Sequence, residues 1–312
     1  MKKENDKTGS SAEYHVPVLL HESIDALQVK PDGAYVDCTF GGGGHTREIL
    51  KRLGAGGKLF VFDQDADAKI NVPNDERLIF IPHNFRHLQR FLRLHKAPAI
   101  DGILADLGVS SHQFDAPERG FSTRFNGDLD MRMDTRQELT ASAVLSTYSE
   151  PRLHKIFEQY GEVTNSKTLA KTIIVARNTG ALKTIADFKN AVHDVVKGNP
   201  NKYFAQVFQA LRIEVNDELG ALKELLQQLP VTLKAGGMVA IITFHSLEDR
   251  LVKLFFRKGN FEDNEDRDVY GTPANISTLD PVNKKPIVPG EKEQRDNPRS
   301  RSAKMRVARK KD

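Results

Sequence analysis

The residues best suited to bind a ligand form a glycine-rich segment near the start of the chain. Gly41 to Gly44 follow the apolar run at 34–40 and precede His45. Four consecutive glycines let the backbone bend tightly and allow a ligand to approach where any side chain would collide. Such turns also occur simply as turns, but four glycines between a predicted strand and a predicted helix favour a ligand site, because open α/β sheets bind ligands at this edge.

Two aspartates indicate which ligand this segment would bind. A dinucleotide fingerprint, G-x-G-x-x-G, needs a third glycine where this chain has Thr46. Asp63 ends the next predicted strand about twenty residues later, where it would accept hydrogen bonds from the ribose of either NAD or S-adenosylmethionine. Asp37, at the end of the first strand, suits a ligand with an ammonium and a sulfonium better than a diphosphate. The residues therefore favour S-adenosylmethionine.

A second polar cluster, Asp106 to Gln113, follows a later predicted strand. In a doubly wound sheet this loop faces the same crevice as the glycine-rich segment. Asp106 and Gln113 could hydrogen-bond an adenine edge or a target amine. The alternative, that Asp106 is only a turn residue before Gly108, is weaker at this position.

Three further segments give weaker signals. Phe85 follows the third predicted strand and could stack on a purine, although phenylalanine is more often a core residue. His245 follows the last buried strand and could act as a general base, but a lone histidine is more often structural. The acids at 128–134 have neither the glycine nor the distal glutamate of an EF-hand, so we predict no metal site.

These residues need a parallel sheet to bring them together. Short apolar runs alternate with helical patterns, which predicts βαβ units and a sheet covered on both faces. The expected strands lie at 34–40, 58–62, 77–81, 100–105 and 237–243.

The alternation stops in the middle of the chain. Between about 117 and 202 the pattern predicts only helices, with Ser166 and Thr184 as N-caps. A single long amphipathic helix is expected over 204–229. We therefore expect an α/β domain built from residues 15–116 and 203–312, and interrupted by an all-helical insertion at 117–202.

Composition narrows the class of protein further. The 312 residues are 39% hydrophobic and 28% charged, which suits a globular protein with a real core. There is no apolar run of the ~20 residues that span a bilayer, and residues 1–14 have the polar character of a flexible leader. The single cysteine, Cys38, fits a reducing compartment. We expect a cytoplasmic protein with no membrane partner.

Positive charge is concentrated at the C-terminal end. The net charge is +4, yet residues 284–312 contain eleven lysines and arginines against four acids. A basic tail attracts the phosphates of nucleic acid, although it also fits a solvated terminus. Within it, residues 304–309 are expected to form an edge strand with a charged face compatible with RNA contact.

Taken together, these segments resemble one family, the ribosomal RNA small-subunit methyltransferase H family. Its members are cytidine N4-methyltransferases of bacterial 16S rRNA. The matching segments run through nearly the whole chain: His15–Leu20, Asp37–His45, Asp63–Asp65, Asp106–Gln113, Glu118–Ser122, Leu129–Met133, Phe208–Asn216, Phe244–Arg250 and Asn297–Arg301. The chain departs from the family at the glycine-rich segment. Relatives often have glycine where this chain has Cys38, before the threonine, and a basic residue among the glycines. These differences should alter only the flexibility of the loop.

The resemblance implies a Rossmann-like methyltransferase domain with an inserted all-helical domain that recognises the substrate. It implies methylation of the exocyclic amine of a decoding-centre cytidine, in 16S rRNA of the small subunit or a late precursor. By matching motif positions, contacts with S-adenosylmethionine fall on Gly43, Gly44, His45, Asp63, Phe85, Asp106 and Gln113.

We expect direct, in-line methyl transfer, with Asp106 as the acceptor of a hydrogen bond from the target amine. Cys38 lies within the first strand, which makes covalent attack on the base ring improbable. Two alternatives are a nicotinamide-dependent oxidoreductase and a non-catalytic RNA-binding factor for ribosome assembly. The oligomeric state stays open, with a homodimer as one alternative.

Overall fold

The computed structural model describes residues 17–180, 182–262 and 277–312. The expected leader, residues 1–14, lies outside this part. A seven-stranded sheet forms the centre, in the order β3-β2-β1-β4-β5-β7-β6, and β7 is antiparallel to both of its neighbours. The strands are β1 (Ala34–Asp37), β2 (Lys58–Phe62), β3 (Leu78–Ile81), β4 (Ile100–Asp106), β5 (Leu233–Thr243), β6 (Leu279–Pro281) and β7 (Lys304–Lys310).

The predicted strands form because their apolar side chains are buried on both faces of the sheet. In β1, Ala34 and Val36 belong to one apolar cluster and Tyr35 belongs to the other. The parallel register pairs Val36 with Phe60 on one side and with Ile103 on the other. This is the Rossmann-like α/β architecture that the strand pattern predicts.

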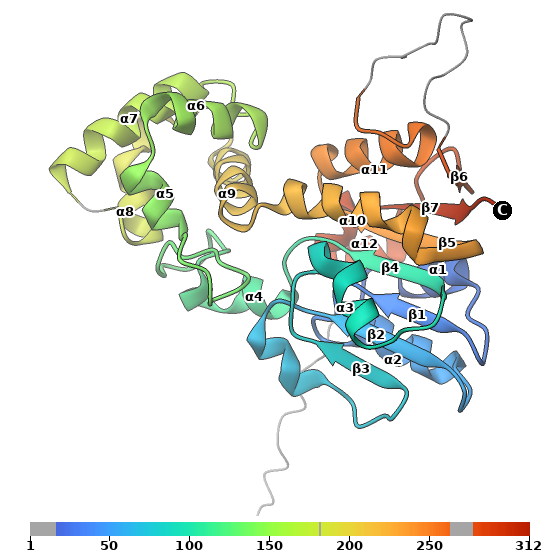
Figure 1. The fold of residues 1–312 in the computed structure, drawn as a ribbon. Helices are drawn as coiled ribbons and strands as arrows, with labels where there is room; N and C mark the ends of the chain where they lie inside the picture. The colour runs from blue at the N-terminus through green and yellow to red at the C-terminus, as the bar shows by residue number, and fades with distance from the viewer. Residues whose placement is uncertain (1–16, 181, 263–276) are drawn as a thin grey trace, which may run out of the picture.

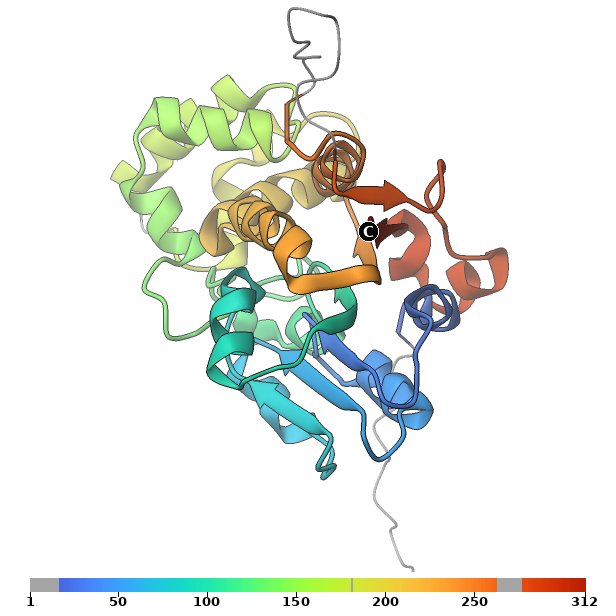
Figure 2. The same ribbon diagram turned by 45° about the vertical axis from the view of Figure 1, so that its right-hand side comes forward.

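Helices cover the sheet on its two faces (Figures 1 and 2). On one face α3 (Leu88–Leu94), α10 (Glu218–Thr232) and α11 (Ser246–Lys258) bury their apolar residues. On the other, α1 (Leu20–Leu27) and α2 (Gly44–Arg52) do the same. The short α12 (Glu291–Asp296) precedes β7. None of the described helices is long and apolar enough to cross a membrane.

The middle of the chain forms a helical unit beside the sheet, drawn in green and yellow in Figure 1. It has its own apolar core, which extends from Phe121 to Val215. Thr184 caps α8 through a reciprocal bond with Asp187, as expected, but Ser166 is the first residue of α7 rather than its N-cap. The helices are α5 (Ala141–Thr147), α6 (Glu150–Gln159), α7 (Ser166–Thr179), α8 (Ile185–Ala191) and α9 (Pro200–Asn216).

The prediction of one long helix over 204–229 is wrong. The chain forms α9 and α10, separated at Asp217, whose φ of 47° and ψ of 45° are left-handed. Aspartate is among the few residues that adopt this conformation readily, so the break costs little. Because α9 packs in the helical core and α10 on the sheet, we propose from the structure that the insertion ends near Asp217. The boundaries expected from the sequence, 117 and 202, stay predictions.

The prediction of a C-terminal edge strand is also wrong. Strand β7 lies between β5 and β6, and its residues from Met305 to Ala308 are buried. Arg306 is only 8% exposed, and its Nε and Nη2 atoms bind the Asp249 carboxylate at 2.6 and 3.1 Å. This basic residue therefore pairs inside the protein and does not form an RNA-facing surface.

Candidate active site

A cavity of about 1180 Å³ opens at the carboxyl ends of the parallel strands. This is the edge at which open α/β sheets bind ligands. It gathers six of the seven residues predicted to bind the cofactor, and Gly43 is the one that does not line it. The six are Gly44, His45, Asp63, Phe85, Asp106 and Gln113.

The glycine-rich segment serves both ligand access and internal packing. Gly41 and Gly42 line the cavity, and a side chain built on Gly41 meets nothing closer than Ser110 at 3.8 Å. In contrast, a Cβ atom on Gly43 would lie 2.8 Å from the Phe40 ring, and one on Gly44 would lie 2.1 Å from Pro17. Gly41 thus leaves space open, while Gly43 and Gly44 allow close packing of the protein itself.

Asp37 does not face a ligand, contrary to the sequence-based argument. Its side chain is 1% exposed and does not line the cavity. One carboxylate oxygen accepts a hydrogen bond from Thr39 N at 3.1 Å and the other from Thr46 Oγ1 at 2.7 Å. Burial raises the pKa of Asp37, and the carboxyl braces the glycine-rich turn from behind.

Asp63 organises the loop and also reaches the cavity. Its Oδ2 accepts from Gly41 N at 2.7 Å and its Oδ1 from Asp65 N at 2.8 Å. Burial raises the pKa of Asp63 to about 6, against the effect of these two bonds. Each carboxylate oxygen has a second lone pair, so Asp63 can still accept hydrogen bonds from a diol.

Asp106 lines the cavity with a partly exposed carboxyl group. Its side chain is 21% exposed, whereas its Oδ1 is buried and has no hydrogen-bond partner among the described residues. Its backbone N–H donates to Thr39 Oγ1 at 2.7 Å. Burial, followed by the nearby charges of Asp37 and Glu248, raises the pKa of Asp106 well above its ordinary value. The accessible part of this carboxyl group can accept a hydrogen bond from a bound ligand.

His45 lies next to Asp106 and is held as a neutral ring. Its Nε2 lies 3.2 Å from the Val18 carbonyl oxygen, which only accepts, so Nε2 carries the proton. Its Nδ1 then faces Asp106 Oδ2 at 3.9 Å. Burial lowers the pKa of His45, which keeps a positive charge out of this corner.

Gln113 is largely committed to the protein. Its Nε2 donates to Asp65 Oδ2 at 2.6 Å, and its Oε1 accepts from Ser110 N at 3.1 Å as part of a capping box at α4 (Ser111–Asp115). Arg119 reaches the same Asp65 oxygen at 2.9 Å and Asp67 at 2.9 Å. The sequence analysis missed Asp65 and Arg119, although both lie in segments that carry the family resemblance.

The opposite wall of the cavity is acidic and was not predicted. Glu218 pairs with Arg212 through both of its oxygens at 2.7 and 3.0 Å. Glu248 accepts from Phe244 N at 2.8 Å and lies 3.2 Å from His245 Nε2. Glu218, His245 and Glu248 are close enough together to hold a cation; Glu218 is already paired with Arg212, whereas His245 Nε2 has no hydrogen-bond partner among the described residues. His245 acts as the N-cap of α11 and does not line the cavity.

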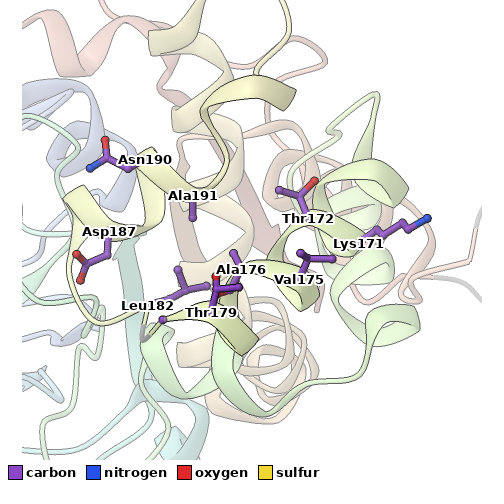
Figure 3. Close-up of a pocket in the computed structure, with 10 residues that line it drawn as sticks. Lys171, Thr172, Val175, Ala176, Thr179, Leu182, Asp187, Asn190 and Ala191 are labelled. Atoms are coloured by element: carbon purple, nitrogen blue, oxygen red, sulfur yellow. The ribbon is translucent and has the colours of Figure 1, made fainter.

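A second hollow, of about 630 Å³, lies in the helical unit between α7 and α8 (Figure 3). Its wall is mixed, with Lys171, Val175 and Asn190 among the side chains drawn. Asp187 at its rim is engaged in the cap of α8. No predicted site residue reaches this hollow, and we assign it no chemistry.

The fold and the glycine-lined cavity define the class of an S-adenosylmethionine-dependent methyltransferase with a Rossmann-like fold. The family is shown by a match of residues 12–311 to the family model described as "MraW methylase family". This chain belongs to that family.

Similar proteins cover almost the whole chain. A protein of Flavobacterium johnsoniae named ribosomal RNA small subunit methyltransferase H is 52% identical over 302 residues, which are 96% of this chain and 99% of the relative. The protein of that name in Bacteroides thetaiotaomicron is 54% identical, over 96% of this chain and 98% of the relative. Among solved structures, a putative rRNA methylase from Clostridium thermocellum covers 95% of this chain and 99% of that chain at 11% identity. Its TM-score is 0.44, too low to support an argument about the site.

Proposed function

We propose that this protein transfers a methyl group from S-adenosylmethionine to the exocyclic N4 amine of a decoding-centre cytidine in 16S rRNA. Relatives more than 50% identical over nearly their full length carry the name ribosomal RNA small subunit methyltransferase H, which supports the substrate class. The observation that carries the proposal is the carboxyl group of Asp106, which is partly exposed in the cavity beside the glycine-rich turn.

The cavity has two different walls, one at the glycine-rich turn and one at Asp106. We assign the wall of the glycine-rich turn, Asp63 and Phe85 to the cofactor, and the space before Asp106 to the target base.

The residues present fit S-adenosylmethionine. The open space at Gly41 admits a ligand close to the backbone, and Asp63 offers a carboxylate to a ribose diol. Gly43, Gly44, His45 and Gln113 hold these elements in place. When bound, S-adenosylmethionine supplies the electrophilic methyl group of its sulfonium.

Asp106 would position and deprotonate the target amine. A cytosine amine is a weak nucleophile because its lone pair is delocalised into the ring. A hydrogen bond from the amine to the Asp106 carboxylate favours the more tetrahedral nitrogen that attacks the methyl group, and holds it in line. The raised pKa of Asp106 makes its carboxylate a stronger base than an ordinary one, able to take the proton that the amine loses.

The substrate must bring an extruded base to this cavity. A base buried in a stack cannot reach an acceptor inside a cavity, so it has to be flipped out or already unpaired. We propose that the helical insertion, beside the opening, holds the surrounding rRNA of the small subunit or a late precursor. The cytoplasmic location and a homodimer stay predictions.

The test uses small subunits from cells that lack this protein. The purified protein and labelled S-adenosylmethionine are added, and the modified nucleotide is mapped. We expect a single methyl group on N4 of one decoding-centre cytidine. Methylation at another atom or nucleotide contradicts the assignment of the base. No transfer to any subunit precursor supports the non-catalytic assembly factor instead.

A further inference from the structure

Two neighbouring segments and one that is distant in the sequence meet at the mouth of the cavity. They are the end of α4, with Phe114 and Asp115, the loop that holds Arg124, and the 3-10 turn Pro298–Ser302, with Arg299. Asp115 and Arg299 both line the cavity, although they are 184 positions apart in the sequence. This group, which we call the arginine pair, lies outside the cofactor wall described above.

The charges of the arginine pair are not balanced. Arg299 Nη2 and Arg124 Nη2 bind the same oxygen, Asp115 Oδ1, at 2.5 and 2.9 Å. One carboxylate thus faces two guanidinium groups, so the group of Arg124, Asp115 and Arg299 has a net charge of +1, beside the cavity-lining carboxylates of Asp67 and Glu118. In addition, Arg299 Nη1 is buried and has no hydrogen-bond partner among the described residues.

Stacking on aromatic rings fixes the orientation of both guanidinium groups. The Cζ atom of Arg299 lies 4.7 Å from the centre of the Phe114 ring, and that of Arg124 lies 5.2 Å from it. Arg124 also lies 5.4 Å from the centre of the Phe125 ring. A guanidinium group that is held by an aromatic ring loses less entropy on forming further hydrogen bonds, and its fork matches the oxygens of a phosphate.

We propose that Arg299 and Arg124 form a binding site for an RNA backbone phosphate next to the extruded nucleotide. This proposal rests on the proposed function. Extruding a base rotates the backbone around it, so the neighbouring phosphates must be held. The net positive charge of the arginine pair with Asp115 and the partly exposed position of both arginines favour a phosphate there, whereas the acidic wall at Glu218 and Glu248 would repel one.

The test measures how binding of unmethylated small subunits depends on salt. Each phosphate contact contributes about 0.7 to the slope of log K against log salt concentration for single-stranded nucleic acid. We expect Arg299→Gln to lower the slope by about that amount and to weaken binding, with unchanged affinity for S-adenosylmethionine. Arg124→Gln should act in the same way.

Arg52→Gln is the matched control. Arg52 is 33% exposed and pairs with an aspartate at 2.7 Å, much as the 35% exposed Arg299 does, but it ends α2 at the opposite edge of the sheet. It should keep the wild-type slope. An unchanged slope in Arg299→Gln, or an equal loss in Arg52→Gln, overturns the proposal.

Asp115→Asn separates a phosphate site from a purely structural tie. If Arg299 only ties the C-terminal segment to α4, then Asp115→Asn should weaken binding as much as Arg299→Gln, which overturns the proposal. A phosphate site predicts equal or tighter binding, because a competing anion is removed. Failure of the proposed function is seen separately, as wild-type protein that binds subunits with the full slope but transfers no methyl group.

Discussion

Replacing Asp106 with asparagine should abolish most of the turnover while leaving the fold intact. The substitution keeps the size and shape of the side chain but removes the negative charge and the basic carboxylate of a residue that lines the cavity. Loss of a positioned acid or base costs roughly 10²–10⁴ in rate. At about 1.4 kcal/mol per factor of ten, this corresponds to roughly 3–5 kcal/mol of lost transition-state stabilisation.

The stability of the same variant provides an internal control. The folded-state pKa of Asp106 is raised above its unfolded value, so the folded protein binds more protons and loses stability as pH rises from about 4 through the folded pKa. Asp106→Asn removes this loss. The variant should therefore be at least as stable as the wild type at pH 8, as measured by urea unfolding.

The assay is single-turnover methyl transfer to unmethylated small subunits, with the affinity for S-adenosylmethionine measured separately. In the wild type the transfer rate should rise with pH, and the midpoint of this rise should lie above the pKa of an ordinary carboxyl group. The rate of Asp106→Asn should not show this rise. Turnover within threefold of wild type in Asp106→Asn would refute the role of Asp106. An inactive variant that has also lost its stability would refute the argument from burial.

Three other predictions concern the walls of the cavity. Because Asp63 has a pKa raised to about 6 and accepts best as a carboxylate, the affinity for S-adenosylmethionine should fall as pH drops below about 6. Asp63→Asn should remove that dependence and raise the Kd about tenfold or more, measurable by calorimetry. Gly44→Ala places a Cβ atom against the Pro17 ring, so the free energy of unfolding in urea should fall by about 1–3 kcal/mol. Gly41→Ala meets open space but has a positive φ of 50°. It should weaken cofactor binding more than Gly44→Ala does. Arg119→Met leaves the buried Asp65 without its charged partner, so the free energy of unfolding in urea should fall by on the order of 3 kcal/mol. A decrease of less than about 0.5 kcal/mol would contradict the role of Arg119 as the partner of Asp65.

The sheet was predictable because its signal is local. Apolar runs such as 34–40 and 58–62 need no knowledge of the rest of the chain, and both became buried parallel strands. The break at Asp217 was not predictable, because the apolar periodicity continues across it and only the packing of α9 and α10 on different cores requires a turn. The place of β7 was missed for a similar reason, since charged residues suggest an edge until the Asp249 partner of Arg306 is known.

The candidate site was predictable in its position but not in its internal contacts. Residues that follow the carboxyl ends of parallel strands must meet, so Asp63 and Asp106 were found from the pattern alone. Asp37 was misjudged, because the sequence does not reveal that Thr39 and Thr46 take up its two oxygens. The arginine pair depends on a contact across 184 positions, which no local pattern carries.

A crystal structure with S-adenosylmethionine bound tests the central claim most directly. The account predicts that the ribose hydroxyls bind Asp63, that the chain beside Gly41 contacts the ligand, and that the exposed part of the Asp106 carboxyl group stays open toward the remaining space of the cavity. A ligand bound outside this cavity, or one whose own amino group covers the exposed part of the Asp106 carboxyl group, would contradict it.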